Sequence, residues 1–414
     1  SNVMMGFVKN YPRTIEAHEA KLPLKITSTP SQAEVYFNPA GTGGGIKQGE
    51  TPLKVYLLPN SSANLMVSKK GFTSYQQLIK SYEQSDFHIN LDKTTRWIYP
   101  ADGIIEGLAV GEGILYATCR DGSLYAINVA TGQLQWRFRT ESGSDISTAP
   151  LLRPPFIYFG CDDGYFYAVR INTGQKVWSV KLGGRLKAAP VLSADAQTLY
   201  IGSDNKYLYA LNGATGEMRW SFLTGGKIPF SCTVATNAVY AISDAKTIHA
   251  VNAKNGQEEW HLKLEEQPTV APCVINNMLY LADTDQHIYA LNLLDRKIKW
   301  RYKTKGVIRT TPVYANGKIL VGSDDGMLSV LEAVQGTLEW QFKTAAAAQS
   351  APAVSSDAFV YLGSNDNYFY ALTLTGGNLV WKYQMGHKNY TTPVIYQDLV
   401  FTAAADRKIY AFER

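Results

Sequence analysis

Cysteine is scarce in this sequence, and long apolar runs are missing. The four cysteines are Cys119, Cys161, Cys232 and Cys273, and their spacing matches no CxxC zinc or thiol-redox signature. They are either buried free thiols or, in an oxidising compartment, disulfide partners. No stretch of about 20 consecutive apolar residues occurs, so the sequence predicts no membrane span.

Charge and catalytic motifs exclude further classes of protein. Lys and Arg number 40 against 35 Asp and Glu, without a basic run, so nothing favours nucleic acid as a partner. Gly-x-Ser-x-Gly, His-Glu-x-x-His and adjacent cysteines are all absent, and the six histidines are scattered. We therefore assign no catalytic, cofactor-binding or metal-binding residue, and we expect a protein without a cofactor that is not an enzyme.

Glycine, tyrosine and tryptophan are abundant, and the tryptophans are periodic. They recur about every 40 residues, a spacing typical of propellers and solenoids. Their indole side chains are expected to be structural, and they are Trp97, Trp136, Trp178, Trp220, Trp260, Trp300, Trp340 and Trp381.

Each period contains the pattern of two β-hairpins. One example has an Ala189-Pro190 pair before an apolar strand, then an Asp204-Asn205 turn, a Tyr209-Ala210 strand, a Thr215-Gly216 turn and Trp220. No segment has a convincing helical period. Four strands per period predict an all-β fold made of propeller blades.

The ends of the repeat array predict how the ring closes. Tyr410-Ala411 is a Tyr-Ala strand with no tryptophan after it, whereas Trp97 has no Tyr-Ala strand before it. Pairing the strand around Trp97 with residues 408–412 gives eight complete blades and leaves no free sheet edge. We therefore predict an eight-bladed β-propeller over residues 93–414, closed by the Trp97 strand.

The repeat resembles a known family. The pattern Ala-x-Asn-x-x-Thr-Gly-x-x-x-Trp, as in residues 126–136 and 210–220, is similar to the PQQ-like repeat. In that family the tryptophan packs between neighbouring blades, so the resemblance implies a packing role for these residues.

Residues 21–92 lack the period and predict a small N-terminal β-sandwich. Ser-x-Pro-x-x-Ala-x-Val-Tyr at 28–36, Gly-x-Thr-Pro-Leu at 49–53 and Lys-x-Gly-Phe at 69–72 resemble the PEGA domain. Residues 1–20 are expected to be a linker or a tag-derived segment, because Ser1-Asn2 resembles the remnant of a cleaved tag.

The innermost strands predict a candidate binding surface at one mouth of the central channel. Its residues lie three or five positions before each blade's Ala-Pro landmark, and they are Glu106, Asp145, Arg185, Lys187, Lys227, Arg309, Gln349, Lys388 and Tyr390. Basic side chains outnumber acidic ones in this set, which favours a small anionic ligand, a peptide or a protein as the partner.

The two resemblances together imply an extracytoplasmic location in a bacterium. PEGA domains often lie just outside bacterial membranes, and PQQ-like propellers occur as sensor regions of serine/threonine kinases. We therefore expect the ligand- or protein-binding sensor region of a membrane-anchored signalling protein. The alternatives are a periplasmic scaffold similar to the outer-membrane assembly lipoprotein and a quinoprotein dehydrogenase.

Overall fold

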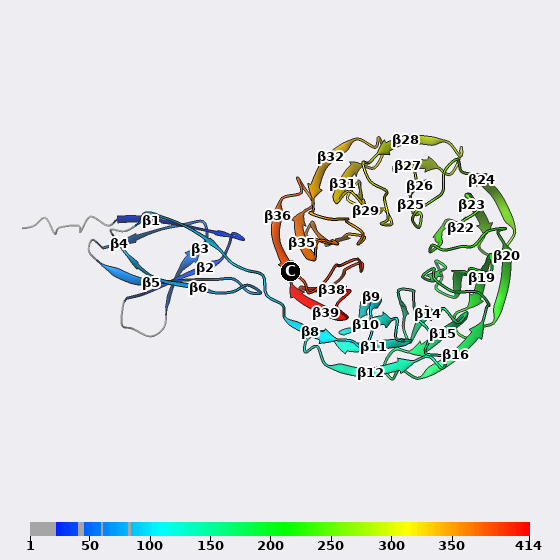
Figure 1. The fold of residues 1–414 in the computed structure, drawn as a ribbon, viewed down its shortest axis with the longest axis horizontal. Coiled ribbons are helices and arrows are strands. Elements are labelled where there is room, and N and C mark those ends of the chain that lie inside the picture. Colours follow the sequence, from blue (N-terminus) through cyan, green and yellow to red (C-terminus); the bar gives the residue numbers. More distant parts are fainter. Residues whose placement is uncertain (1–21, 40–44, 59–60, 82–83) are drawn as a thin grey trace, which may run out of the picture. The chain divides into compact units, whose positions relative to one another are not determined.

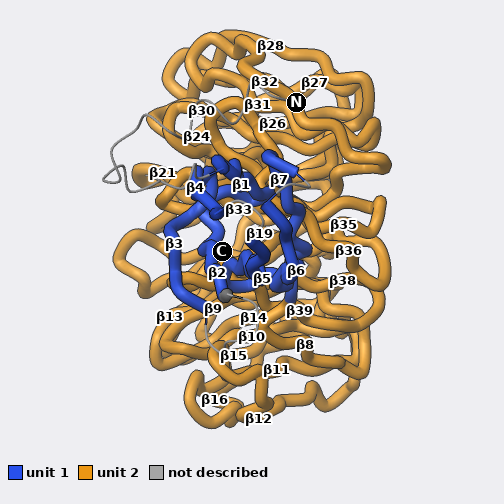
Figure 2. The backbone as a smooth tube through the Cα atoms, turned by 90° about the vertical axis from the view of Figure 1, so that its left-hand side faces the viewer, with its two compact units in different colours: residues 1–94 blue, residues 95–414 orange. Residues whose placement is uncertain are grey.

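The computed structural model describes residues 22–39, 45–58, 61–81 and 84–414, and in these ranges it contains strands and no helix. The expected segment 1–20, Lys21 and the centre of the loop at 39–48 lie outside the described residues. The chain divides into two compact units, residues 1–94 and 95–414 (Figures 1 and 2).

The first unit consists of two sheets around one apolar core. One sheet has the order β4-β1-β7 and the other β3-β2-β5-β6. The strands are β1 (Leu22–Thr29), β2 (Glu34–Pro39), β3 (Ile46–Glu50), β4 (Leu53–Leu57), β5 (Ser62–Ser68), β6 (Tyr75–Lys80) and β7 (Asp86–Asn90). Alternate residues such as Ile26, Val35, Leu65 and Val67 are fully buried between the sheets, as the period of a half-buried strand requires.

The second unit contains eight four-stranded antiparallel sheets that follow one another around a ring (Figure 1). The first four are β9 (Ile105–Gly111), β10 (Ile114–Cys119), β11 (Ser123–Asn128), β12 (Leu134–Arg139); β13 (Leu151–Arg153), β14 (Phe156–Gly160), β15 (Tyr165–Arg170), β16 (Lys176–Lys181); β17 (Val191–Leu192), β18 (Thr198–Gly202), β19 (Tyr207–Asn212), β20 (Met218–Leu223); and β21 (Thr233–Ala235), β22 (Ala238–Ser243), β23 (Thr247–Asn252), β24 (Glu258–Lys263).

The next three sheets are β25 (Cys273–Ile275), β26 (Met278–Ala282), β27 (His287–Asn292), β28 (Ile298–Lys303); β29 (Val313–Ala315), β30 (Lys318–Gly322), β31 (Met327–Glu332), β32 (Leu338–Lys343); and β33 (Ala353–Val354), β34 (Phe359–Gly363), β35 (Tyr368–Thr373), β36 (Leu379–Gln384). The last sheet joins both ends of the unit and comprises β37 (Val394–Tyr396), β38 (Leu399–Ala404), β39 (Lys408–Glu413) and β8 (Trp97–Pro100).

Pairing of β8 with β39 closes the ring, and Trp97 lies opposite Ala411. Arg96 reinforces the junction because its guanidinium contacts Glu413 at 2.6 Å and its backbone N–H donates to the Ala411 carbonyl. This pairing leaves no exposed edge on the outer side of β39.

The tryptophans join neighbouring sheets. The Trp300 indole N–H donates to the carbonyl of Ala333 in the next sheet at 3.1 Å, and Trp97, Trp136, Trp220 and Trp340 make the equivalent bond. Gly336 lies under the Trp300 ring with φ +71°, where a Cβ would come within 2.3 Å of the indole. A glycine is therefore needed at this turn for both its backbone conformation and its lack of a side chain.

Candidate binding site

Eight connectors lead from the outermost strand of one sheet into the innermost strand of the next. One carbonyl in each connector accepts a hydrogen bond from the hairpin turn between the second and third strands of the sheet that it enters. The donor–acceptor pairs are Arg120–Ile104, Asp162–Asp145, Asp204–Arg185, Asp244–Lys227, Thr284–Gln267, Asp324–Val307, Asn365–Ala347 and Ala405–Lys388, at 2.8–3.0 Å. Because every connector enters its innermost strand at the same end, these residues gather at one mouth of the channel.

We call three sets of residues the channel-mouth ring: the eight that provide the accepting carbonyls, the eight that lie two positions after them, and the eight turn residues that donate to them. Of the residues expected there, Asp145, Arg185, Lys227 and Lys388 provide the accepting carbonyls. The other five lie two positions after an accepting residue, and they are Glu106, Lys187, Arg309, Gln349 and Tyr390. The structure thus places all nine at two equivalent positions of the repeat, with Glu106 near the start of β9 and the other eight in connectors.

One sector of the ring is built around Glu106. Its carboxylate pairs with Arg120, and its side chain is only 16% exposed. Burial raises the pKa of the Glu106 carboxyl, Arg120 opposes that shift, and the neighbouring Asp145 adds to it. Burial also raises the pKa of Tyr390, whose phenol lies near Glu106.

A second sector is a chain of polar contacts that joins two neighbouring sheets, β29–β32 and β33–β36. Arg309 Nε donates to Asp324 Oδ2 at 2.8 Å, and Gln349 Nε2 donates to Asp324 Oδ1 at 2.8 Å. Asn365 Nδ2 then donates to Gln349 Oε1 at 2.9 Å. Asp324 and Gln349, the two middle side chains, are therefore held by neighbours on both sides, which fixes their positions on the ring.

The third sector contains cations without such partners. Arg185, Lys187 and Lys227 are exposed, and within the described part of the chain their side chains have no ion pair or hydrogen bond. Lys388 is exposed as well, with its ammonium 6.0 Å from the centroid of the Tyr390 ring.

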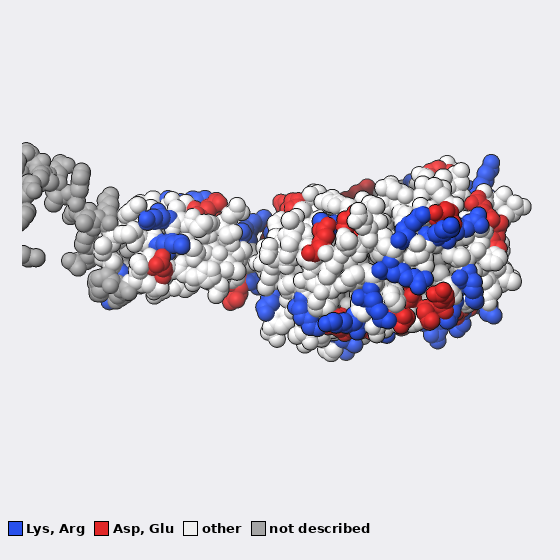
Figure 3. All heavy atoms as spheres, turned by 90° about the horizontal axis from the view of Figure 1, so that it is seen from above, with Lys and Arg blue, Asp and Glu red and all other residues white. Residues whose placement is uncertain are grey.

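Reasoning from the connectors alone missed the turn residues. With them included, basic and acidic side chains are equal in number on the ring. The basic ones are Arg120, Arg185, Lys187, Lys227, Arg309 and Lys388, and the acidic ones are Glu106, Asp145, Asp162, Asp204, Asp244 and Asp324. The signal for the missed aspartates is their recurrence just after the second strand, which turn chemistry also explains. The wider surface likewise carries both signs of charge side by side (Figure 3).

The described residues offer little for metal or thiol chemistry. No group of three His, Cys, Asp or Glu side chains among them could hold a metal ion. All four cysteines are free thiols, and burial raises the pKa of Cys119 and of Cys161 to about 12. No helix in the described ranges has the length and hydrophobicity to cross a membrane.

Three known families match parts of the sequence. The family described as "Beta-alanine-activating enzyme, beta-propeller" matches residues 166–413, more than half of the chain. The family described as "Outer membrane protein assembly factor BamB" matches residues 83–221, and the PEGA domain matches residues 22–95. The chain therefore carries a PEGA domain followed by a PQQ-like propeller, as the sequence motifs predicted.

Solved structures share the propeller fold at low sequence identity. The computationally designed protein Ika8 is 18% identical, with a TM-score of 0.68 over 76% of this chain and 98% of its own. BamB from Moraxella catarrhalis is 16% identical, with a TM-score of 0.64 over 78% of this chain and 97% of its own. Quinohemoprotein alcohol dehydrogenase ADHIIG from Pseudomonas putida HK5 is 14% identical, with a TM-score of 0.64 over 77% of this chain and 76% of its own. No curated protein sequence matches significantly.

Proposed function

The chain belongs to the β-propeller family described as "Beta-alanine-activating enzyme, beta-propeller", and from this premise we propose that it is a non-catalytic binding region. We interpret its eight sheets as the blades of a closed eight-bladed propeller and its first unit as a small β-sandwich. The PEGA domain beside a PQQ-like propeller favours an extracytoplasmic sensor of a membrane-anchored bacterial signalling protein, of the kind related to serine/threonine kinases.

The observation that carries this proposal is the third sector of the channel-mouth ring. Arg185, Lys187 and Lys227 present exposed cations without partners in the described structure, whereas Arg120 and Arg309 are paired. Cations without partners can bind an anionic group without first breaking an internal ion pair. The ligand is thus an anionic segment of a protein or peptide, or a small anion, bound over this sector.

Binding of a fluorescein-labelled hexaglutamate peptide tests the sector by fluorescence anisotropy at low salt. The variant with Arg185, Lys187 and Lys227 all changed to Ala is expected to bind at least tenfold more weakly than the wild type. A matched control changes Arg170, Lys254 and Lys297 to Ala, which removes the same charge at the turns between third and fourth strands, at the opposite end of the sheets from the ring. Equal affinity in the ring variant and the wild type would remove the proposal, as would equal weakening in the control, because net charge alone would then explain it.

A scaffold role is the second candidate, and the match of residues 83–221 to the BamB family favours it. A scaffold would bind a folded protein stably through the ring, whereas a sensor would bind its ligand reversibly. Crosslinking in cells at an introduced ring residue separates these two roles, because a scaffold gives one constant partner irrespective of the growth medium.

The quinoprotein alternative rests on the fold shared with quinohemoprotein alcohol dehydrogenases. PQQ-dependent dehydrogenases place an adjacent Cys-Cys pair over the cofactor, but here Cys119 and Cys161 belong to different sheets and both are buried. The described residues therefore do not fit that cofactor. Adding PQQ and calcium and then measuring absorbance and dye reduction with alcohols should give no turnover.

A further inference from the structure

One hairpin contact recurs in five of the eight sheets. A tyrosine in the third strand forms a hydrogen bond with an Asp or Asn in the turn four residues before it. The pairs are Tyr125–Asp121, Tyr167–Asp163, Tyr209–Asn205, Tyr370–Asp366 and Tyr410–Asp406. In each case the same side chain also accepts a backbone N–H two residues further on. One acidic or amide group thus caps the turn and satisfies a buried phenol.

The sheet β25–β28 departs from this arrangement at Asp283. The seven equivalent positions hold small residues, namely Cys119, Cys161, Ser203, Ser243, Ser323, Ser364 and Ala404. Asp283 is 7% exposed, and its Oδ1 accepts the backbone N–H groups of Asp285 and His287 at 3.0 and 3.1 Å. Asp283 has therefore taken over the capping of the turn.

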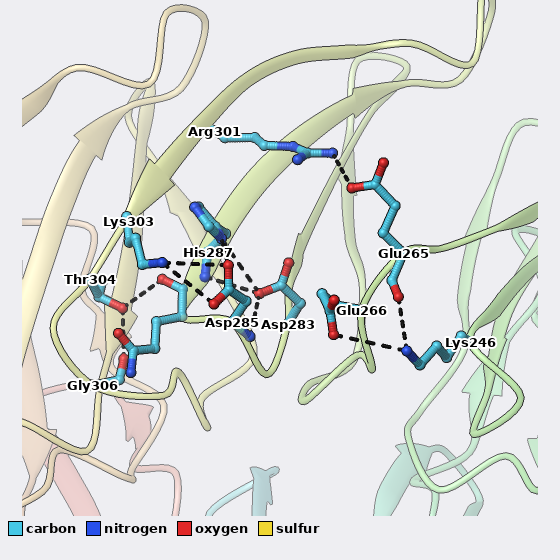
Figure 4. Close-up of polar contacts among 11 residues, drawn as sticks. Lys246, Glu265, Glu266, Asp283, Asp285, His287, Arg301, Lys303, Thr304 and Gly306 are labelled. Atoms are coloured by element: carbon cyan, nitrogen blue, oxygen red, sulfur yellow. Dashed lines mark hydrogen bonds and ion pairs between the residues drawn. The ribbon is translucent and has the colours of Figure 1, made fainter.

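Asp285 is released from the phenol by this change. Its carboxylate contacts His287 Nδ1 at 3.3 Å and the ammonium of Lys303 at 3.4 Å instead (Figure 4). Tyr289, the equivalent tyrosine, is 4% exposed, and no hydrogen bond joins its hydroxyl to any residue in the described ranges. Burial, with help from Asp283, raises the pKa of Tyr289, so the phenol stays neutral.

The phenol lines a groove of about 560 Å³ between the sheets β21–β24 and β25–β28. Asp283 and His287 contribute to the same lining, and Glu265 and Glu266 come from the connector that follows β24. The groove is also lined by four basic side chains, those of Lys263, Arg296, Lys297 and Arg301. The acidic connector residues are exposed and bridge to Arg301 and Lys246 at 3.5 and 3.9 Å (Figure 4). Asp283 is the more buried carboxylate, and the nearest basic side chain is His287, whose Nδ1 lies 3.9 Å from Asp283 Oδ1.

We propose that this groove binds a cationic group, an alkylammonium or a guanidinium, between the Asp283 carboxylate and the Tyr289 hydroxyl. A buried carboxylate with no short ion pair gains from a cation that enters its cavity. An ammonium has three donors and no acceptor, so the carboxylate and the neutral phenol oxygen both match it. The cation is carried by a Lys or Arg side chain of a peptide or by a free alkylamine. This site adjoins the ring position formed by Gln267 and Thr284, but it uses none of the cations of the third sector and does not depend on the function proposed for them.

Isothermal titration calorimetry on the whole chain tests the site with four probes: N-acetyl-lysine methylamide, N-acetyl-arginine methylamide, 1,4-diaminobutane and N-acetyl-norleucine methylamide. The norleucine probe matches lysine but lacks the ammonium. We expect saturable binding of at least one cationic probe, and at least tenfold weaker binding of the norleucine compound. Preference for the amino-acid amides would identify a peptide as the source of the cation, and preference for the diamine would identify a free amine.

Two variants locate the binding, and a third serves as their control. Asp283→Ser installs the residue that four other sheets already carry, so the turn should fold, and binding should weaken at least tenfold. Tyr289→Phe should also weaken binding. Tyr410→Phe removes a hydroxyl that is already hydrogen-bonded to Asp406, so this variant should bind the probe as the wild type does. The proposal is overturned if no cationic probe saturates, if norleucine binds equally well, or if either groove variant binds like the wild type while retaining the native melting profile.

Discussion

The closing strand β8 should be the most easily detached strand of the ring, and replacing Trp97 by Ala should reveal this. Trp97 donates to the Val129 carbonyl at 2.8 Å and packs 5.6 Å from the Phe401 ring. Losing the hydrogen bond costs about 1 kcal/mol and losing the ring contact about another. With the remaining apolar burial, the total comes to about 3 kcal/mol, at the lower end for a Trp→Ala change.

Trp220→Ala is the matched control, because that indole donates to the Ala253 carbonyl at 3.1 Å and lies 5.6 Å from the Tyr200 ring. The two variants should lose similar packing energy but differ in which amides open. A short turn holds β20 against β19, whereas the partner of β8 lies at the other end of the unit. Once β8 is detached, pairing it with β39 again therefore costs a large loop-closure entropy.

Hydrogen exchange measured by mass spectrometry gives the readout. A local loss of about 3 kcal/mol corresponds to roughly a hundredfold faster exchange for the β39 amides that point toward β8. The β19 amides in Trp220→Ala should accelerate much less. The reasoning is refuted if β39 exchanges at the wild-type rate in Trp97→Ala, or if β19 in the control accelerates to the same extent.

Three further outcomes follow from single side chains. Gly336→Ala should destabilise the unit by at least about 2 kcal/mol more than Gly317→Ala in urea unfolding. Both glycines have positive φ, but only at Gly336 would the added Cβ clash with an indole ring. Glu106→Gln should flatten the pH dependence of the free energy of unfolding. Because folding raises the pKa of Glu106, its favourable contribution is present below the unfolded pKa and is lost as pH rises through the folded pKa. A pH series of unfolding curves should show this trend only in the wild type. Cys119 and Cys161, both with a pKa raised to about 12, should resist Ellman's reagent at pH 8 until the protein is unfolded; rapid labelling of the native protein would contradict their burial.

Much of the fold could be predicted from the sequence because the repeat is local and strongly patterned. The tryptophan period, the Tyr-Ala strands and the Thr-Gly turns each mark a fixed place in a hairpin. The pairing partner of Trp97 followed by elimination, since only one strand at each end of the array lacked a neighbour. The family matches confirm both the PQQ-like propeller and the PEGA domain.

The electrostatics of the candidate site could be predicted only in part. The connector residues were identified from their distance to the Ala-Pro landmark, but Asp204 and Asp324 face them from hairpin turns that lie far along the sequence. An aspartate in such a turn is fully explained by turn chemistry, so a single sequence gives no reason to place it on the ring. The apparent basic excess on the connectors therefore disappears when the turn residues are included.

The groove beside Tyr289 illustrates a different limit, because its signal is a change in hydrogen-bond partner. Asp283 and Asp285 both look like turn aspartates in the sequence, and only the hydrogen bonds of the folded turn show that the first has taken the capping role from the second. The repeat supplies the comparison needed to interpret this change: the same phenol is satisfied in five sheets and released in one. A charged residue in a position that is otherwise small carries a desolvation cost, and Tyr289 lines the groove without an internal hydrogen bond to its hydroxyl in the described structure. A cation bound in the groove would offset the desolvation cost of the Asp283 carboxylate and would supply a hydrogen-bond donor to the phenol oxygen.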